Sequence, residues 1–202
     1  MIPSPIQYDV QLTRFPETSG EYVDGIQVRV SRREDTLFTF AYILKGDLAR
    51  IRLPPHAVAR PADRLWEHTC FEAFVQLKGQ AVYYEFNFSP SGEWAVYSFR
   101  DYRDGGPMEN DELDPKIAVR RESETLELSA VMRLDLLPVI QPGAVLRLGL
   151  SAVIEDDGGR LSYWALKHPP GKPDFHHPDN FILEIQLPIV DGTNAIAYTG
   201  KP

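Results

Sequence analysis

Residues 65–100 read LWEHTCFEAFVQLKGQAVYYEFNFSPSGEWAVYSFR, and this stretch decides the fold. It contains three runs in which apolar side chains occupy every second position. In the first run Phe71, Ala73 and Val75 share one face, while Glu72 lies on the opposite face. A period of two is typical of a half-buried antiparallel strand. The stretch therefore predicts a three-stranded meander with one apolar face and one face that carries carboxylate, amide and imidazole groups.

The register of the first two strands depends on the turn between them. If Gly79 and Gln80 form a two-residue type II′ turn, which favours glycine first, Glu72 lies opposite Asn87. A three-residue loop would instead bring Glu72 level with Phe86, because a slip of one residue exchanges the two faces of a strand. We therefore predict the pairing of Glu72 with Asn87.

Apolar and alternating runs elsewhere in the chain predict further strands, separated by turns that are rich in proline and glycine. The expected strands cover residues 3–12, 26–30, 37–44, 117–121, 126–132, 145–154, 161–166 and 182–187. One helical turn is expected within 134–140, and loops are expected at 101–107, 109–114 and 168–180. About ten short strands at this spacing are typical of an antiparallel β-sandwich or barrel.

The composition agrees with an all-β chain. Hydrophobic residues make up 43% of the 202 residues and aromatic residues 11%, and 17 prolines and 14 glycines are spread between the apolar runs. Aromatic residues favour strands, and proline and glycine favour turns. No stretch has the composition of a linker, so we expect one domain over residues 1–202, with a flexible tail from about residue 188.

Charge and cysteine content indicate the partners and the compartment. The net charge of −8 argues against nucleic acid or an anionic membrane as a partner. A single cysteine leaves no internal disulfide and is typical of a reducing compartment. No basic start with a following apolar run is visible, and no apolar segment approaches the thickness of a bilayer. We expect a cytoplasmic protein.

Two stretches of the chain resemble the bacterial DOMON-like proteins, which are related to the type 9 carbohydrate-binding modules. The first is LWEHTCFEAF at 65–74 with YYEFNFSPSG at 83–92, and the second is YWALKHP at 163–169 with PDFHHP at 173–178. The resemblance extends from about residue 38 to residue 181. It implies a two-sheet antiparallel β-sandwich of Ig-like architecture that holds a ligand on one sheet.

The same resemblance implies a sugar site. In the carbohydrate-binding relatives, a sugar end is clamped between two tryptophans, and an acidic residue and amides contact its hydroxyls. The matching positions here are Trp66 and Trp164 for the clamp and Glu72 for the acid, with Asn87 and Arg100 as further polar contacts. Lys167 or His168 would close the loop side. The expected ligand-binding residues are Trp66, His68, Glu72, Asn87, Arg100, Trp164, Lys167 and His168.

Each of these residues also has a purely structural interpretation. Both tryptophans could pack in the core of the sandwich, as is common in Ig-like folds. Glu72 lies among apolar residues and could form an ion pair with Arg100 or Arg64, since a buried carboxylate needs a partner.

Three other functions stay open. The first is a metal- or thiol-dependent enzyme that uses His68, Cys70, Glu72 and the histidines of loop 168–180, because zinc needs three or four converging ligands and a thiol needs an activating base. The second is a haem-binding DOMON-type module, which would use a methionine and a histidine. The third is a module that binds another protein through a sheet edge.

The calcium of the carbohydrate-binding relatives has no matching cluster of oxygen ligands in this sequence. The acidic run at 109–114 lacks the spacing of a calcium loop and is expected to be solvated. We expect no cofactor.

Overall fold

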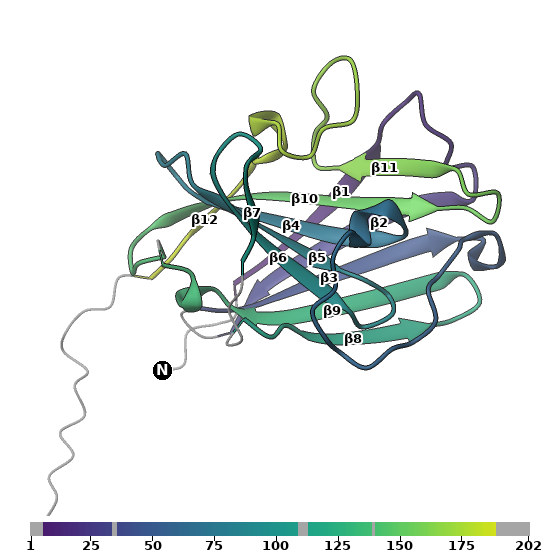
Figure 1. Cartoon of the computed structure of the whole chain (residues 1–202), viewed down its shortest axis with the longest axis horizontal. Helices are drawn as coiled ribbons and strands as arrows, with labels where there is room; N and C mark the ends of the chain where they lie inside the picture. Colours follow the sequence, from purple (N-terminus) through teal and green to yellow (C-terminus); the bar gives the residue numbers. More distant parts are fainter. Residues whose placement is uncertain (1–5, 34–35, 109–112, 139, 189–202) are drawn as a thin grey trace, which may run out of the picture.

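The computed structural model describes residues 6–33, 36–108, 113–138 and 140–188, and it is built almost entirely of antiparallel strands (Figure 1). Twelve strands belong to two sheets. The first sheet has the order β1-β2-β3-β9-β8, formed by Ile6–Arg14, Val23–Arg32, Leu37–Gly46, Thr125–Arg133 and Lys116–Arg121. The fold class predicted from the sequence, an antiparallel β-sandwich, is confirmed.

The second sheet carries the central meander. Its order is β7-β6-β5-β4-β10-β11, formed by Asp104–Pro107, Trp94–Asp101, Tyr83–Phe88, Cys70–Leu77, Val145–Glu155 and Leu161–Ala165. Strand β12, Leu183–Gln186, pairs with the first part of β10. The two sheets are joined where the end of β1 pairs with β11, through Thr13 with Ala165 and Arg14 with Trp164.

The core lies between the two sheets and is made by alternate residues of each strand. Tyr42 on β3 shows how closely the sheets approach. Its ring lies 5.1 Å from the ring of Phe71 on β4, and its hydroxyl donates a 2.7 Å hydrogen bond to the backbone carbonyl of Glu72. Burial of both inner faces is the main stabilising contribution, since each large apolar side chain contributes roughly 1.5–3 kcal/mol.

The register predicted for the meander is confirmed, although the turn is placed differently. Glu72 pairs with Asn87. The turn, however, is centred on Lys78 and Gly79, because Gln80 N–H donates to the carbonyl of Leu77 at 3.0 Å. Gly79, with φ of 86°, occupies the third position of this turn, where a positive φ favours glycine.

Most other predicted strands are present, and one predicted loop is wrong. Within the described residues β1 covers Ile6–Arg14, while residues 1–5 of the predicted strand 3–12 lie outside them; over most of its length β1 is the edge of the first sheet. The predicted loop 101–107 contains strand β7, which extends the second sheet. The predicted helical turn is the 3-10 helix Leu134–Leu136. Residues 109–112 of the acidic run and the predicted tail from 189 onward lie outside the described residues.

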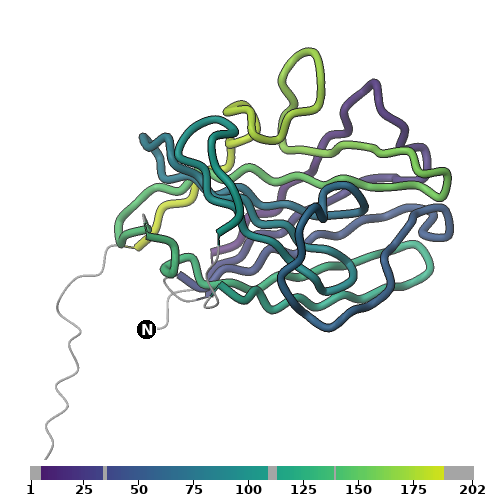
Figure 2. Tube along the Cα trace, in the orientation of Figure 1, coloured from purple at the N-terminus to yellow at the C-terminus, as the bar shows by residue number. Residues whose placement is uncertain are grey.

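The outer face of the second sheet differs from the prediction, because it is buried. Strand β5 is buried at all six of its residues, and six of the eight residues of β4 are buried. The segment after β11 runs over this face (Figure 2) and packs Phe181 on Phe74 at 5.7 Å and on Tyr83 at 5.5 Å. Loop 168–180 therefore acts as a third layer, which includes the 3-10 helix Pro178–Asn180.

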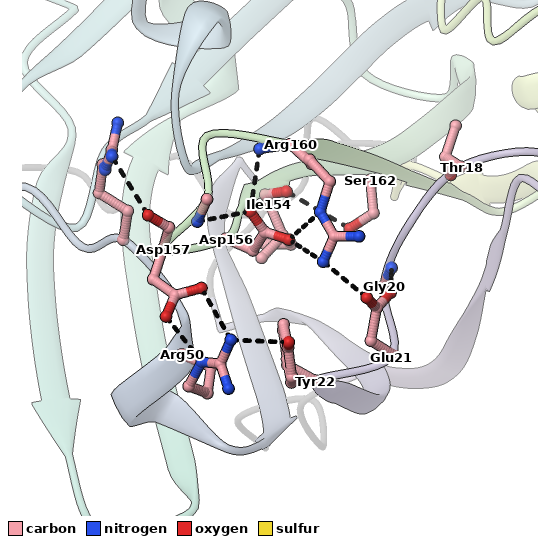
Figure 3. Close-up of polar contacts among 12 residues, drawn as sticks. Thr18, Gly20, Glu21, Tyr22, Arg50, Ile154, Asp156, Asp157, Arg160 and Ser162 are labelled. Atoms are coloured by element: carbon pink, nitrogen blue, oxygen red, sulfur yellow. Dashed lines mark hydrogen bonds and ion pairs between the residues drawn. The ribbon is translucent and has the colours of Figure 1, made fainter.

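A network of ion pairs joins the β10–β11 turn to two neighbouring loops (Figure 3). Arg50 pairs with Asp157 at 2.6 Å and donates to the hydroxyl of Tyr22 at 2.8 Å. Arg160 bridges to Glu21 at 2.6 Å. These groups are exposed, so each pair contributes at most about 1 kcal/mol, and the network chiefly fixes the positions of the loops.

Gly46 at the end of β3 gives a test of this packing. A Cβ at this position would lie 2.1 Å from the carbonyl oxygen of Tyr22, and its φ of 156° is already unfavourable for other residues. We expect Gly46→Ala to lower the free energy of unfolding by roughly 2–4 kcal/mol, measured by urea denaturation. Gly106→Ala is the control, because nothing lies within 4 Å of its Cβ. Equal midpoints for the two variants would contradict the close approach.

Candidate functional site

A hollow of about 520 Å³ opens on the outer face of the second sheet. Its floor comes from the strands, where Glu72, Glu85 and Val153 point outward. The loop before β4, the β6–β7 hairpin and loop 168–180 surround it. Because side chains alternate along a strand, the residues that face the hollow are the neighbours of those that fill the core.

Two carboxyl groups lie at the floor of the hollow. Glu72 is 2% exposed and Glu85 is 6% exposed. The pairing of Glu72 with Asn87 puts all three polar side chains on one face, since Asn87 and Glu85 are two residues apart. The amide of Asn87 donates to Glu85 Oε1 at 2.7 Å and accepts a weak 3.5 Å hydrogen bond from the thiol of Cys70.

Burial changes the acidity of both carboxyl groups. It raises the pKa of Glu72 well above its ordinary value, and repulsion from Glu85 adds to this effect. Burial also raises the pKa of Glu85 to about 7, although the hydrogen bond from Asn87 and the charge of Arg103 oppose the increase. Because the pKa of Glu85 lies near neutral pH, this carboxyl group is only partly ionised there.

His176 lies against this pair and is neutral. Its Nδ1 is 2.9 Å from the hydroxyl of Tyr83, which itself accepts a hydrogen bond from the backbone N–H of Arg103 at 3.0 Å. The Tyr83 hydroxyl therefore donates to Nδ1, which leaves the ring proton on Nε2, 3.5 Å from Glu85. Burial and the charge of Arg103 lower the pKa of His176 to about 4.

Arg103 and Asp174 close one side of the hollow. The guanidinium of Arg103 lies 2.6 Å from Asp174, which also accepts a hydrogen bond from the hydroxyl of Tyr102. Although burial acts to raise it, these two hydrogen bonds keep the pKa of Asp174 below its ordinary value. The contact ties the β6–β7 hairpin to loop 168–180, because the two partners belong to different segments.

Aromatic rings form the walls. Trp66, on the 3-10 helix Leu65–Glu67, is 37% exposed and packs edge-on against Tyr97 at 5.4 Å. The hydroxyl of Tyr97 donates to Asp63 at 2.6 Å. Tyr163 and Phe175 form a second edge-to-face pair at 6.0 Å. The hollow thus combines apolar ring surfaces with carboxyl groups.

The predicted pair of tryptophans does not meet across this hollow. Trp66 and Glu72 both line it, but Trp164 is 6% exposed and belongs to the core between the sheets. Its indole N–H donates to the hydroxyl of Ser162 at 3.0 Å. Trp164 faces the sandwich interior because its neighbour Tyr163 takes the outward position on β11. The alternative interpretation of Trp164 as a core residue is the correct one.

The other predicted ligand-binding residues do not line the hollow. Arg100 pairs with Asp104 at 2.6 Å, and Lys167 pairs with Asp179 at 3.0 Å. His168 bonds to the carbonyl oxygen of Thr13 at 2.8 Å, His68 bonds to Glu155 at 2.7 Å, and Asn87 is completely buried beneath the floor. Their roles in binding stay predictions.

Glu72 does not form the ion pair with Arg100 or Arg64 that its structural interpretation required. Arg64 pairs with Glu67, and Arg100 pairs with Asp104, so neither arginine reaches Glu72. Among the described residues, no lysine or arginine forms an ion pair with Glu72 or with Glu85.

The sequence analysis missed several residues that line the hollow. These are Glu85, Tyr97, Arg103, Tyr163 and Phe175, and His176 was considered only as a histidine of the alternative metal or thiol enzyme. The signal for Glu85 and Tyr97 was present, since the alternation of the meander already placed Glu85 on the polar face. Nothing in the sequence indicated that the hairpin and the loop would bring Arg103 and His176 to it.

The residues of the proposed metal or thiol enzyme have other partners. Cys70 is completely buried, and burial raises the pKa of its thiol well above the ordinary value, which disfavours a nucleophilic thiolate. Over the ranges that the structure describes, no three histidine, cysteine, aspartate or glutamate side chains form a group that could hold a metal ion. Within the same ranges, no helix is long and apolar enough to cross a membrane.

Neither a protein-family model nor a curated protein sequence matches the chain. A crystal structure of a proposed carbohydrate-binding protein from Bacteroides uniformis matches with a TM-score of 0.66 and 14% identity, over 90% of this chain and 85% of that one.

Two further structures are of a carbohydrate binding module of family 9 from Caldicellulosiruptor kristjanssonii. The complex with cellotriose has a TM-score of 0.55 and 11% identity, over 95% of this chain and 89% of the module. The complex with glucose has a TM-score of 0.52 and 10% identity, over 87% and 82%. At these identities the likeness shows a shared fold.

The buried carboxyl groups predict how stability depends on pH. Folding raises the pKa of Glu85 from 4.5 to about 7, so the folded state binds this proton more tightly and loses stability as the pH rises through that range. His176, whose pKa is lowered from 6.5 to about 4, contributes the opposite slope. The variant Glu85→Gln removes the contribution of Glu85 to the pH dependence and leaves that of His176.

We expect Glu85→Gln to gain stability over the unsubstituted protein by on the order of 3 kcal/mol between pH 4.5 and pH 8. Urea denaturation at a series of pH values measures this gain. Glu184→Gln removes an exposed carboxylate that pairs with Lys78 and serves as the control. If the free energies of unfolding of Glu85→Gln and of the unsubstituted protein differ by the same amount at every pH, the pKa of Glu85 is not raised by folding.

Proposed function

We propose that this protein binds a carbohydrate-like small molecule in the hollow and does not catalyse a reaction on it. The volume of about 520 Å³ lies within the range of small-molecule sites, which are commonly concave and aromatic-lined with a few polar groups. The observation that carries the proposal is the combination of an exposed indole, Trp66, with buried carboxyl groups in one open hollow.

This combination suits the two surfaces of a sugar. The C–H face of a pyranose packs on an aromatic ring, and Trp66 presents such a ring at the rim. The hydroxyl groups need acceptors and donors, which Glu72, Glu85 and Arg103 can supply from the floor and one side. Structures of the same fold hold cellotriose or glucose, which supports this choice of ligand class.

The narrower assignments from the sequence are part of the proposal. We infer a DOMON-like protein from the runs at 65–74, 83–92 and 163–178, with a bacterial source and a cytoplasmic location as expectations. Support for the location comes from the single, buried Cys70. The organisation as one domain over residues 1–202 also stays a prediction.

The first test is to remove the indole. We expect Trp66→Ala to weaken the binding of glucose or cellobiose at least tenfold with the fold intact, because the exposed ring supplies the apolar platform. Titration calorimetry at millimolar sugar measures the affinity. Val119→Ala is the matched control, since Val119 is 38% exposed but lies on β8 of the other sheet.

Fluorescence gives an independent measurement. Trp66 is 37% exposed, whereas Trp94 and Trp164 are each 6% exposed, so quenching by acrylamide reports mainly on Trp66. A bound sugar should protect this ring from the quencher. If no mono- or disaccharide at millimolar concentration produces heat or protection, the proposal is refuted.

A further inference from the structure

We propose that the hollow selects a positively charged ligand, namely a sugar or sugar-like ring that carries a protonated amine. The inference rests on the proposed function and narrows its ligand class. It follows from the balance of charge in the hollow, from the way its charged groups are already paired, and from the aromatic rings around it.

The lining of the hollow is strongly acidic. Four of the lining residues carry carboxyl groups, namely Asp63, Glu72, Glu85 and Asp174, whereas Arg103 is the one lysine or arginine among them. An enclosed surface with one dominant sign of charge concentrates ligands of the opposite sign. The hollow therefore favours a cation and opposes a carboxylate or phosphate ligand.

Arg103 offsets the negative charge of the floor only in part, although it lowers the pKa of both Glu72 and Glu85. Its guanidinium is in contact with Asp174 at 2.6 Å, so one positive and one negative charge already compensate each other at the side of the hollow. His176, the other basic group at the wall, faces Glu85 through Nε2 at 3.5 Å and is neutral near pH 7.

The carboxyl groups at the floor are buried and lack a cationic partner. Glu72 and Glu85 are 2% and 6% exposed, and within the described part of the chain neither forms an ion pair with a lysine or arginine. An unpaired buried carboxylate is costly, and this cost is why burial raises the pKa of both groups. A ligand ammonium group at the floor would supply the missing partner.

The rings that surround the floor are suited to the same ligand. Trp66, Tyr97, Phe99, Tyr163 and Phe175 all line the hollow. The face of an aromatic ring attracts a cation, most strongly when the cation is removed from water. Aromatic faces and carboxylates together form a site in which an ammonium group is favoured over a hydroxyl group of the same size.

Binding of such a ligand is linked to protons. The groups that face the floor are Glu72 on β4, Glu85 and Tyr83 on β5, Tyr97 on β6 and His176 on the loop, with Arg103 and Asp174 at the side. A cation next to Glu72 and Glu85 favours the ionised form of both carboxyl groups, whose pKa values are raised by burial. Ammonium binding near pH 6.5 should therefore release a proton, whereas binding of a neutral sugar should not.

The experiment compares three sugars of similar shape by titration calorimetry at pH 6.5. Glucosamine carries a charged amine, glucose carries a hydroxyl group at the same position, and N-acetylglucosamine carries a neutral amide. We expect glucosamine to bind at least tenfold more tightly than either neutral sugar. Titrations in two buffers of different ionisation enthalpy measure the released proton.

Three variants locate the effect. Glu85→Gln and Glu72→Gln should each reduce the ratio of glucosamine affinity to glucose affinity to less than threefold, whatever the absolute affinity for glucose becomes. Both remove a buried ionisable carboxyl group and keep the shape of the side chain, so thermal denaturation should show folded proteins. Glu184→Gln lowers the net negative charge by the same amount on the exposed surface of β12 and should keep the full preference.

Each other outcome has a distinct meaning. Equal or tighter binding of glucose overturns this inference and leaves the proposed function standing. A preference for glucosamine that survives in both floor variants overturns the assignment to Glu72 and Glu85. Absence of binding for all three sugars refutes the proposed function and this inference with it. Tetramethylammonium binding as tightly as glucosamine, with no binding of glucose, keeps the cation site but refutes the sugar.

Discussion

The pairing of β4 with β5 is the constraint on which the rest of the structure depends. With Glu72 opposite Asn87, alternate residues of both strands face the first sheet, whereas the carboxyl groups of Glu72 and Glu85 face away together with Phe74 and Tyr83. A shift of one residue would direct the carboxyl groups into the core and the phenylalanines outward. The same register therefore forms the hydrophobic core and places two acids side by side on the outer face.

The outer face then needs a cover, and loop 168–180 provides it. Phe181 and His176 pack on Phe74 and Tyr83, and the contact between Arg103 and Asp174 fixes the hairpin against the loop. The cover is incomplete above Glu72 and Glu85, where the hollow remains. Burial by the loop is also what changes the acidity of the two carboxyl groups, since an open sheet face would leave them solvated.

An arrangement of this kind costs stability, because two acids are held close together away from water. Asn87 offsets part of this cost by its hydrogen bond to Glu85. The extensive core between the sheets, with Tyr42 and Phe71 in contact across it, supplies the stability that such a site requires. Unfavourable polar groups held by a well-packed scaffold are typical of binding sites.

The sequence by itself determined most of the strands and the register of the meander, because alternation with a period of two is a local property, and its resemblance to the DOMON-like proteins put Trp66 together with Glu72. It could not decide whether the tryptophan of the distant strand β11 reaches the hollow. Because side chains alternate along β11, Trp164 faces the core and Tyr163 faces the hollow. It also could not show that Arg103 and His176 converge on Glu85. Those contacts join segments far apart in the chain, and they exist because the loop folds back over the sheet.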